Sequence, residues 1–288
     1  MKNNPIPAEF SIYGSFEVLK EENNTQLRSI MDDAAADKNA QAGSIKQKIA
    51  DFYATGMDSV TIEKTGIKAI QPELDKIEAI KNAVDLIKLV AYFHTSGVNQ
   101  LFYFGSGQDD KNSEHVIAQL YQGGLGLPDR DYYLSNDERS KEIRKEYVKH
   151  IGRTLELAGI NKEQADKDAE TILKTETQLA QVSSTRLELR DPIKNYNKTD
   201  LAGLQKMAPQ FEWQQYFAAV GLTATSEINV GQPKFITGMA KLITEVPVDQ
   251  WKLYVKWHLL HEASPFLRQH FKKNNLIFTV LYFRELKK

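Results

Sequence analysis

The sequence of 288 residues contains no cysteine, which excludes disulfide bonds and thiol catalysis. It has no run approaching the ~20 apolar residues needed to span a bilayer, and its first residues do not form the apolar core of a signal peptide. The formal net charge of −1 gives no reason to expect nucleic acid or an anionic membrane as a partner. These features do not fix the cellular compartment. We expect a periplasmic or extracellular location if this chain belongs to a parent protein whose signal peptide is missing here, and a cytoplasmic location otherwise.

Helical periodicity, in contrast, runs through most of the chain. With 41% hydrophobic residues, the chain can form one large globular domain or two small ones. We expect helices from Ser15 past Leu27, over 45–56, from Pro72 to near Gly97, from Asn136 or Asp137 to Gly159, from near Lys162 to about Val182, from Thr199 to Pro209, from about Lys234 to Ile243, and from Val248 to Phe271. The aromatic run Leu101–Phe104 predicts one short strand or hairpin near 100–106. The expected fold class is therefore mainly α, an irregular multi-helix domain.

The densest part of the sequence follows this strand. The polar stretch 108–112 predicts a solvated turn, and Ser113 is expected to cap a short helix over 114–120. Gly126 and Pro128 then mark a second sharp bend of the backbone. Two turns so close together indicate a specific local structure.

Alternating charges follow the second bend, where Asp129, Arg130 and Asp131 stand beside Tyr132 and Tyr133. The carboxylates of this turn and of the preceding one are of a type that binds calcium. We favour instead an internal ion-pair and capping network, in which Arg130 ties the turn to another helix.

Two familiar site patterns are incomplete. A zinc peptidase helix needs His-Glu-x-x-His, but Pro265 occupies the place of the second histidine after His261 and Glu262. His258 shares a helix face with His261, and without further ligands nearby the pair is expected in the core or on the surface. The glycines around Ser106 lack the lysine of a phosphate loop and lead into carboxylates that would repel phosphate.

The segments Asp109–Ser113 and Leu125–Tyr133 resemble the N-terminal region of the neprilysin-type zinc metallopeptidases, a family that includes neprilysin, endothelin-converting enzyme and bacterial oligopeptidase O. They match its patterns Asp-Asp-Lys-Asn-Ser and Leu-Gly-Leu-Pro-x-Arg-Asp-Tyr-Tyr. Further matches are Ile6-Pro7, Tyr13-Gly14-x-Phe16, Asp191-Pro192, Tyr196-Asn197-Lys198 and Phe211-x-Trp213. The residues expected to form a structural motif are Asp109, Asp110, Lys111, Asn112, Gly126, Pro128, Arg130, Asp131, Tyr132 and Tyr133.

This resemblance implies a two-lobed, mainly helical zinc endopeptidase that encloses oligopeptides in a central chamber. Residues 1–273 would be its N-terminal, chamber-roofing domain, with no catalytic residue and no cofactor of its own. Zinc would belong to a missing C-terminal catalytic domain, on which this lobe would pack through a large apolar face. The alternative is a stand-alone helical module that binds peptides or a protein without catalysis.

The resemblance also carries over two substrate-binding positions. Neprilysin has arginines on either side of its Tyr-Gly-x-Phe element, and Ile12 and Lys20 occupy those positions here. Isoleucine cannot bind a peptide's carboxylate, and lysine lacks the forked guanidinium. Endopeptidase action is therefore the implied activity, rather than selection by the C-terminal carboxylate.

Residues 274–288 are expected to be an out-of-frame tail. The family pattern is lost abruptly after Lys273, and a shift of reading frame at Asn274 restores Phe-x-Phe-Tyr-Gly with permitted codons. The apolar run Leu276–Phe283 would then lack evolved partners and be strand-prone.

Overall fold

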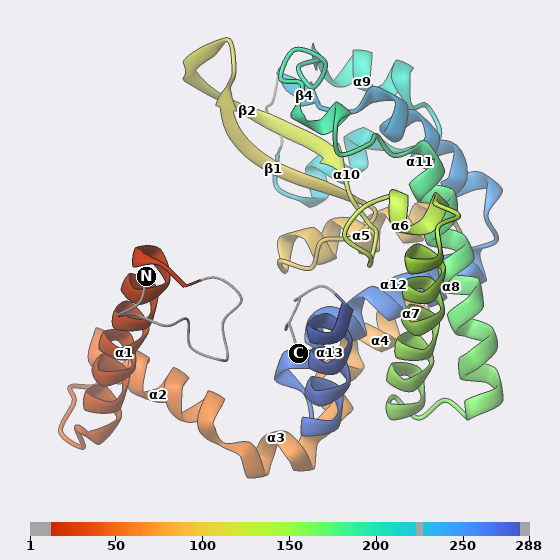
Figure 1. Cartoon of the computed structure of the whole chain (residues 1–288). Coiled ribbons are helices and arrows are strands. Elements are labelled where there is room, and N and C mark those ends of the chain that lie inside the picture. The colour runs from red at the N-terminus through yellow and green to blue at the C-terminus, as the bar shows by residue number, and fades with distance from the viewer. Residues whose placement is uncertain (1–12, 223–226, 283–288) are drawn as a thin grey trace. The chain divides into compact units, whose positions relative to one another are not determined.

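The structure is a computed structural model that describes residues 13–222 and 227–282, as two compact units. The first unit comprises Met1–Ala69 with Phe266–Lys288, and the second comprises Ile70–Pro265. Both are mainly helical, and the second contains a small sheet (Figure 1). The expectation of a mainly α fold with a hairpin near 100–106 is confirmed.

The first unit contains α1 (Ser15–Ala36), α2 (Ile45–Met57), α3 (Ser59–Thr65) and α13 (Gln269–Tyr282). Helices α1 and α2 pack side by side (Figure 1). A hydrogen bond of 2.8 Å from the Tyr53 hydroxyl to Asp32 connects them. Helix α1 begins at Ser15, and Gly14 is its N-cap.

The second unit contains most of the helices. They are α4 (Gln71–Glu78), α5 (Ala83–Thr95), α6 (Asp131–Leu134), α7 (Glu138–Leu157), α8 (Lys162–Val182), α9 (Leu201–Met207), α10 (Trp213–Ala219), α11 (Pro233–Glu245) and α12 (Val248–Ala263). The side chain of Asp137 accepts from the amide of Ser140 to cap α7, and Asn161 does the same for α8 through Gln164.

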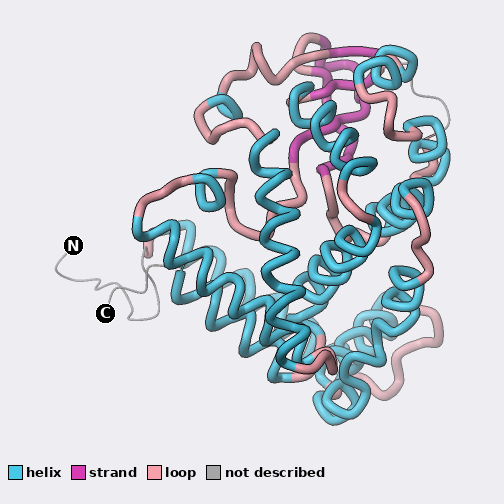
Figure 2. Tube along the Cα trace, turned by 90° about the vertical axis from the view of Figure 1, so that its right-hand side faces the viewer, coloured by secondary structure: helices cyan, strands magenta, loops and turns pink. Residues whose placement is uncertain are grey.

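The sheet contains β1 (Phe102–Asp109), β2 (Asn112–Gln122), β3 (Lys198–Thr199) and β4 (Ile228–Val230) in the order β1-β2-β4-β3. Strands β1 and β2 form an antiparallel hairpin, β4 runs parallel to β2, and β3 is antiparallel to β4. Figure 2, in which strands are magenta, shows how small this sheet is beside the helices. The hairpin is far longer than the strand expected at 101–104.

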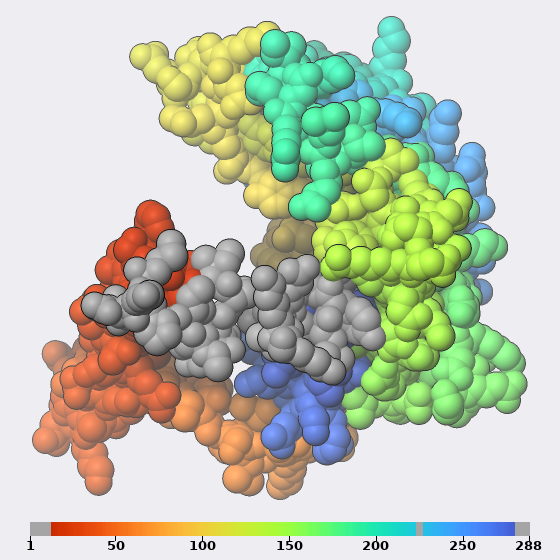
Figure 3. Space-filling view, in the orientation of Figure 1, coloured from red at the N-terminus to blue at the C-terminus, as the bar shows by residue number. Residues whose placement is uncertain are grey.

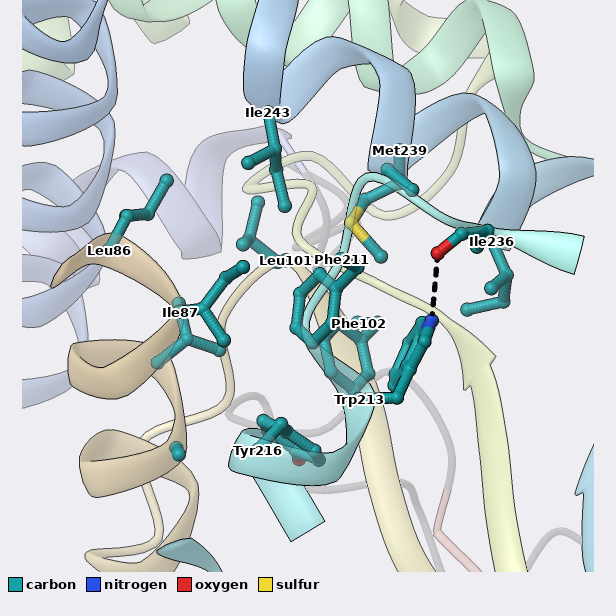
Figure 4. Close-up of a cluster of buried hydrophobic side chains, with 14 of the residues drawn as sticks. Leu86, Ile87, Leu101, Phe102, Phe211, Trp213, Tyr216, Ile236, Met239 and Ile243 are labelled. Carbon is teal, nitrogen blue, oxygen red and sulfur yellow. Dashed lines mark hydrogen bonds between the residues drawn. The ribbon is translucent and has the colours of Figure 1, made fainter. Parts of the chain in front are cut away.

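One face of the sheet forms the core of the second unit. Phe102 is 1% exposed, and its ring centroid lies 5.6, 5.7 and 5.3 Å from those of Phe211, Trp213 and Tyr216 (Figure 4). The Trp213 indole donates a 3.2 Å hydrogen bond to the carbonyl of Ala208, which satisfies its buried N–H. Aromatic side chains therefore fix α10 against β1.

Three expectations about local structure are wrong. The helix expected over 114–120 is instead strand β2, because its backbone pairs with β1 on one side and β4 on the other. The helix expected from Pro72 to Gly97 is two helices, α4 and α5, with a separate N-cap at Asn82. The last expected helix ends at Ala263, where a 3₁₀ turn containing Pro265 follows.

The apolar run near the C-terminus is helical rather than strand-like. Helix α13 covers Gln269–Tyr282, and Phe278 is buried while Leu276 is 55% exposed. Phe283 lies outside the described residues. The out-of-frame origin of 274–288 stays a prediction.

Candidate functional site

Asp109 anchors the tip of the β1–β2 hairpin. Its side chain is buried and accepts hydrogen bonds of 2.9 Å from the Lys111 amide, 2.8 Å from the Tyr196 hydroxyl and 2.9 Å from the Lys198 ammonium. The Lys198 ammonium is the main cause of a pKa for Asp109 well below its usual range, followed by the other two donors. The Asp-Asp-Lys-Asn-Ser turn and the Tyr-Asn-Lys segment, distant in sequence, are thus one structural unit.

A line of charges continues from this carboxylate across the sheet. The Lys198 ammonium also contacts Glu227 at 2.7 Å, and Glu227 lies 3.7 Å from a ring nitrogen of His115. Asp110 and Asn112 are exposed at the tip, and the Lys111 ammonium lies 4.5 Å from the centre of the Tyr196 ring. Asp109 and Lys111 of this turn therefore both contact the Tyr196–Lys198 segment.

Gly126 lies against a buried polar cluster beneath the second motif. A Cβ at this position would lie 1.9 Å from the Tyr147 hydroxyl and 3.2 Å from a carboxylate oxygen of Glu176. The Tyr147 hydroxyl contacts Glu176 at 2.8 Å and accepts a 2.9 Å hydrogen bond from the Trp257 indole. The motif needs glycine here because helices α7 and α8 approach its backbone closely.

Tyr133 and Glu176 complete the cluster. The Tyr133 hydroxyl donates to Glu176 at 2.7 Å and accepts from the Leu127 amide at 2.8 Å. The Glu176 side chain is fully buried, and a ring nitrogen of His258 lies 2.9 Å from its carboxylate. Burial, and then the Glu176 charge, raise the pKa of Tyr133 far above its usual range. Its hydroxyl is therefore a permanent donor at neutral pH.

Asp129 has partners on both sides of the charged turn. It lies 3.5 Å from the Arg186 guanidinium and accepts from the Asp131 amide at 2.8 Å. The Nε of Arg130 is buried and has no hydrogen-bond partner among the described residues. The tie to another helix through Arg130 stays a prediction.

Two other residues of this turn differ in their surroundings. The Tyr132 carbonyl accepts a 2.6 Å hydrogen bond from Arg144, and Pro128 is exposed in the bend.

The histidine pair of α12 belongs to the core. His258 faces Glu176, and the ring of His261 packs 5.2 Å from that of Trp257. Burial, with nearby His258, lowers the pKa of His261 to about 4. In the described ranges, 13–222 and 227–282, no cluster of three or more His, Asp or Glu residues could hold a metal ion. No helix within those ranges is long and apolar enough to cross a membrane.

The structure describes one of the two substrate positions carried over by resemblance. Lys20 is exposed on α1, and Ile12 lies outside the described residues. What α1 does present is apolar: Phe16, Leu27 and Ile30 are 82%, 56% and 54% exposed and fall on one helical face. In α2, Phe52 is 83% exposed. This exposed apolar face could be anticipated only from the periodicity of the helices.

A groove that sequence reasoning missed lies beside the hairpin. It has a volume of about 520 Å³ and is lined by the ends of α5 and α10 together with the middle of β1 and β2. His94 contributes to its lining, with the Tyr216 hydroxyl 2.6 Å from Nδ1 and the Gln100 carbonyl 2.9 Å from Nε2. Burial lowers the pKa of His94, so the ring is neutral. Gly105 and Gly107, which follow the aromatic run, were the signal available in the sequence.

Comparison with known proteins shows similarity over the whole chain. The sequence model described as peptidase family M13 matches residues 1–287. Endothelin-converting enzyme 1 of Rattus norvegicus is 27% identical over 289 residues, covering 94% of this chain and 36% of that protein. Neprilysin-3 of Drosophila melanogaster is 25% identical over 293 residues, covering 94% and 37%. The chain thus spans just over a third of the length of these relatives.

Comparison with solved structures also shows similarity over nearly the whole chain. A crystal structure of the zinc metalloprotease Zmp1 of Mycobacterium tuberculosis with an inhibitor superposes with a TM-score of 0.90 at 28% identity, covering 99% of this chain and 44% of that one. PepO from Lactobacillus rhamnosis shares the fold, with a TM-score of 0.79 at 15% identity over 97% of this chain and 44% of that one.

Proposed function

The chain belongs to peptidase family M13, and from this membership we propose that it is the non-catalytic N-terminal domain of a zinc metalloendopeptidase that cleaves oligopeptides. This proposal rests on one observation: the family match covers residues 1–287, yet the chain contains no His-Glu-x-x-His sequence. Zinc, the activated water and the general base would then belong to a catalytic region outside this chain.

The polar clusters around Asp109 and Glu176 support a structural role for this domain. Glu176 and Asp109 are both buried and fully engaged by donors from the chain itself. A general base or nucleophile needs access to substrate, which neither carboxylate has. Their role is structural: Asp109 holds the first turn to the Tyr196–Lys198 segment, and Glu176 holds the second turn to α8.

Exposed apolar side chains on α1 and on α2 support a packing partner. Phe16 and Phe52 are each more than four-fifths exposed, at 82% and 83%. Exposed apolar surface on soluble proteins marks interaction sites when it is extensive. The relatives extend far beyond the aligned region, which covers 36% of endothelin-converting enzyme 1. We assign these side chains to contact with the catalytic region.

Reading the DNA beyond the last codon tests this proposal. We expect one of the three reading frames to encode a His-Glu-x-x-His sequence. The same read across Lys272 tests the out-of-frame tail, because a missing or extra base there would restore the family pattern. Downstream DNA without a zinc-binding motif in any frame would favour the stand-alone binding module.

A further inference from the structure

The outer edge of strand β1 is unpaired. Within the described part of the chain, the sheet order places β1 at one side, where it is hydrogen-bonded to β2 alone. Among the residues that the structure describes, no backbone group outside the hairpin bonds to the stretch 103–107. The edge therefore offers a row of free N–H and C=O groups to another strand. Figure 3 shows the hairpin, in yellow, projecting from the second unit.

This edge lacks the usual devices that prevent strand pairing. Natural edges are protected by charged side chains, by proline, or by a bulge. The stretch 102–108 contains no charge and no proline, and the irregularity in register comes only at Gln108/Asp109. A seven-residue neutral edge is thus left open.

Two glycines lie within this edge without being required by the chain's own packing. A Cβ on Gly107 would meet only the Gln119 side chain, at 3.4 Å, and one on Gly105 would meet the end of the half-exposed Tyr103 at 3.0 Å. Neither glycine has a positive φ. Glycine inside a strand often marks a place where another backbone approaches closely.

The groove of about 520 Å³ adjoins the same edge. Phe104 and Ser106 of β1 line it, with Val116 of β2, which is 69% exposed, and Leu222 after α10. Among the described residues, no Asp, Glu, Lys or Arg lines it, and His94 is neutral. Side chains of an added strand point alternately to the two faces of the sheet. Every second side chain would therefore point to the face that carries this groove.

We propose that the β1 edge binds an extended oligopeptide segment by strand addition, with one uncharged apolar side chain in the adjoining groove. Main-chain hydrogen bonds supply affinity in this binding mode, and the groove supplies side-chain selectivity. The inference rests on the proposed function for its ligand class, since oligopeptides are the substrates of the parent peptidase. It assigns the non-catalytic domain a peptide site of its own.

Amide hydrogen exchange on the full 288-residue chain tests this site. The probe is the capped heptapeptide acetyl-Thr-Val-Thr-Phe-Thr-Val-Thr-amide, which alternates polar and apolar residues. We expect saturable binding that slows exchange of amides within 103–107. The same peptide with proline in place of both valines loses two ladder donors and should bind at least about tenfold more weakly.

Two matched variants locate the site. Ser106→Lys places a charge on the edge and in the groove, and should weaken binding about tenfold because the ammonium must be desolvated. His115→Lys adds a charge to the opposite face of the same hairpin, keeps the contact with Glu227, and should change affinity less than about twofold.

Three outcomes would overturn the inference: no binding of the probe, protection confined to amides elsewhere, or equal affinity of the proline peptide. Protection of 103–107 that rises with protein concentration without peptide, with dimers in sedimentation, would assign the edge to a second copy instead. The downstream reading frame tests the proposed function separately. If the peptide does not bind but the downstream DNA encodes a zinc-binding motif, the edge site is refuted and the proposed function stands.

Discussion

The hydroxyl of Tyr133 lies 2.7 Å from the carboxylate of Glu176, and this buried hydrogen bond joins the second motif to helix α8. The same hydroxyl accepts from the Leu127 amide, so one side chain organises both the turn and its anchor. A fully buried carboxylate is tolerated only when donors surround it. The Tyr133 and Tyr147 hydroxyls donate to Glu176, and a ring nitrogen of His258 lies 2.9 Å from the carboxylate.

Replacement of Tyr133 by phenylalanine should destabilise the protein. The substitution leaves the Leu127 amide without its acceptor and removes one donor from Glu176. Each buried group left unsatisfied costs about 1–3 kcal/mol. The urea midpoint measures the loss, and Tyr103→Phe, at a half-exposed position, is the matched control. Equal midpoints for the two variants would contradict the anchoring role.

Gly126→Ala should be costly for a steric reason. The new methyl group would lie 1.9 Å from the Tyr147 hydroxyl. Over-packing of this kind typically costs about 1–3 kcal/mol. Gly56→Ala in α2 is the control, because nothing lies within 4 Å of the added Cβ, and the helix should gain slightly. Thermal unfolding of both variants gives the comparison, and a Gly126→Ala protein as stable as wild type would refute the close approach.

Asp109 should contribute to the loss of stability in acid. Its folded pKa is held low, chiefly by Lys198, so its contribution is complete above the unfolded pKa of about 3.9 and is lost as pH falls through the folded pKa. Asp109→Asn should therefore flatten the fall in the urea midpoint between about pH 5 and pH 2. Asp110→Asn, at the exposed neighbouring position, should leave the profile unchanged. Parallel profiles for all three proteins would rule out this contribution.

The exposed apolar side chains of α1 and α2 should cause the isolated chain to associate. Phe16 and Phe52 are 82% and 83% exposed, and burying them between copies removes apolar surface from water. The double variant Phe16→Ser/Phe52→Ser should shift sedimentation towards monomer. Asn24→Ser, on the exposed surface of α1, should not. A wild-type chain that stays monomeric at high concentration would contradict this prediction.

Local signals in the sequence were sufficient for the long helices. Helix α8 runs from Lys162 to Val182, as predicted, because Asn161 is a strong N-cap and the apolar positions keep a helical period. Helix α7 ends before Gly159, which has a φ of +97° that suits glycine. Such features depend on a few neighbouring residues and can be read directly.

Strand β2 and the polar clusters could not be obtained in this way. Ser113 followed by Glu114 has the composition of a helix start, but pairing with β1 and with Ile228 of β4 decides the conformation. Asp109 and Tyr133 were identified within their motifs. Their partners Lys198 and Glu176 lie 89 and 43 residues away, so only the fold brings them together.

Metal analysis combined with a cleavage assay tests the account most directly. The purified chain is dialysed with zinc, its metal content is measured, and a quenched fluorescent oligopeptide is added. The account predicts no stoichiometric zinc and no cleavage, because the chain contains no His-Glu-x-x-His sequence. One tightly bound zinc per chain, with cleavage that a chelator abolishes, would contradict it.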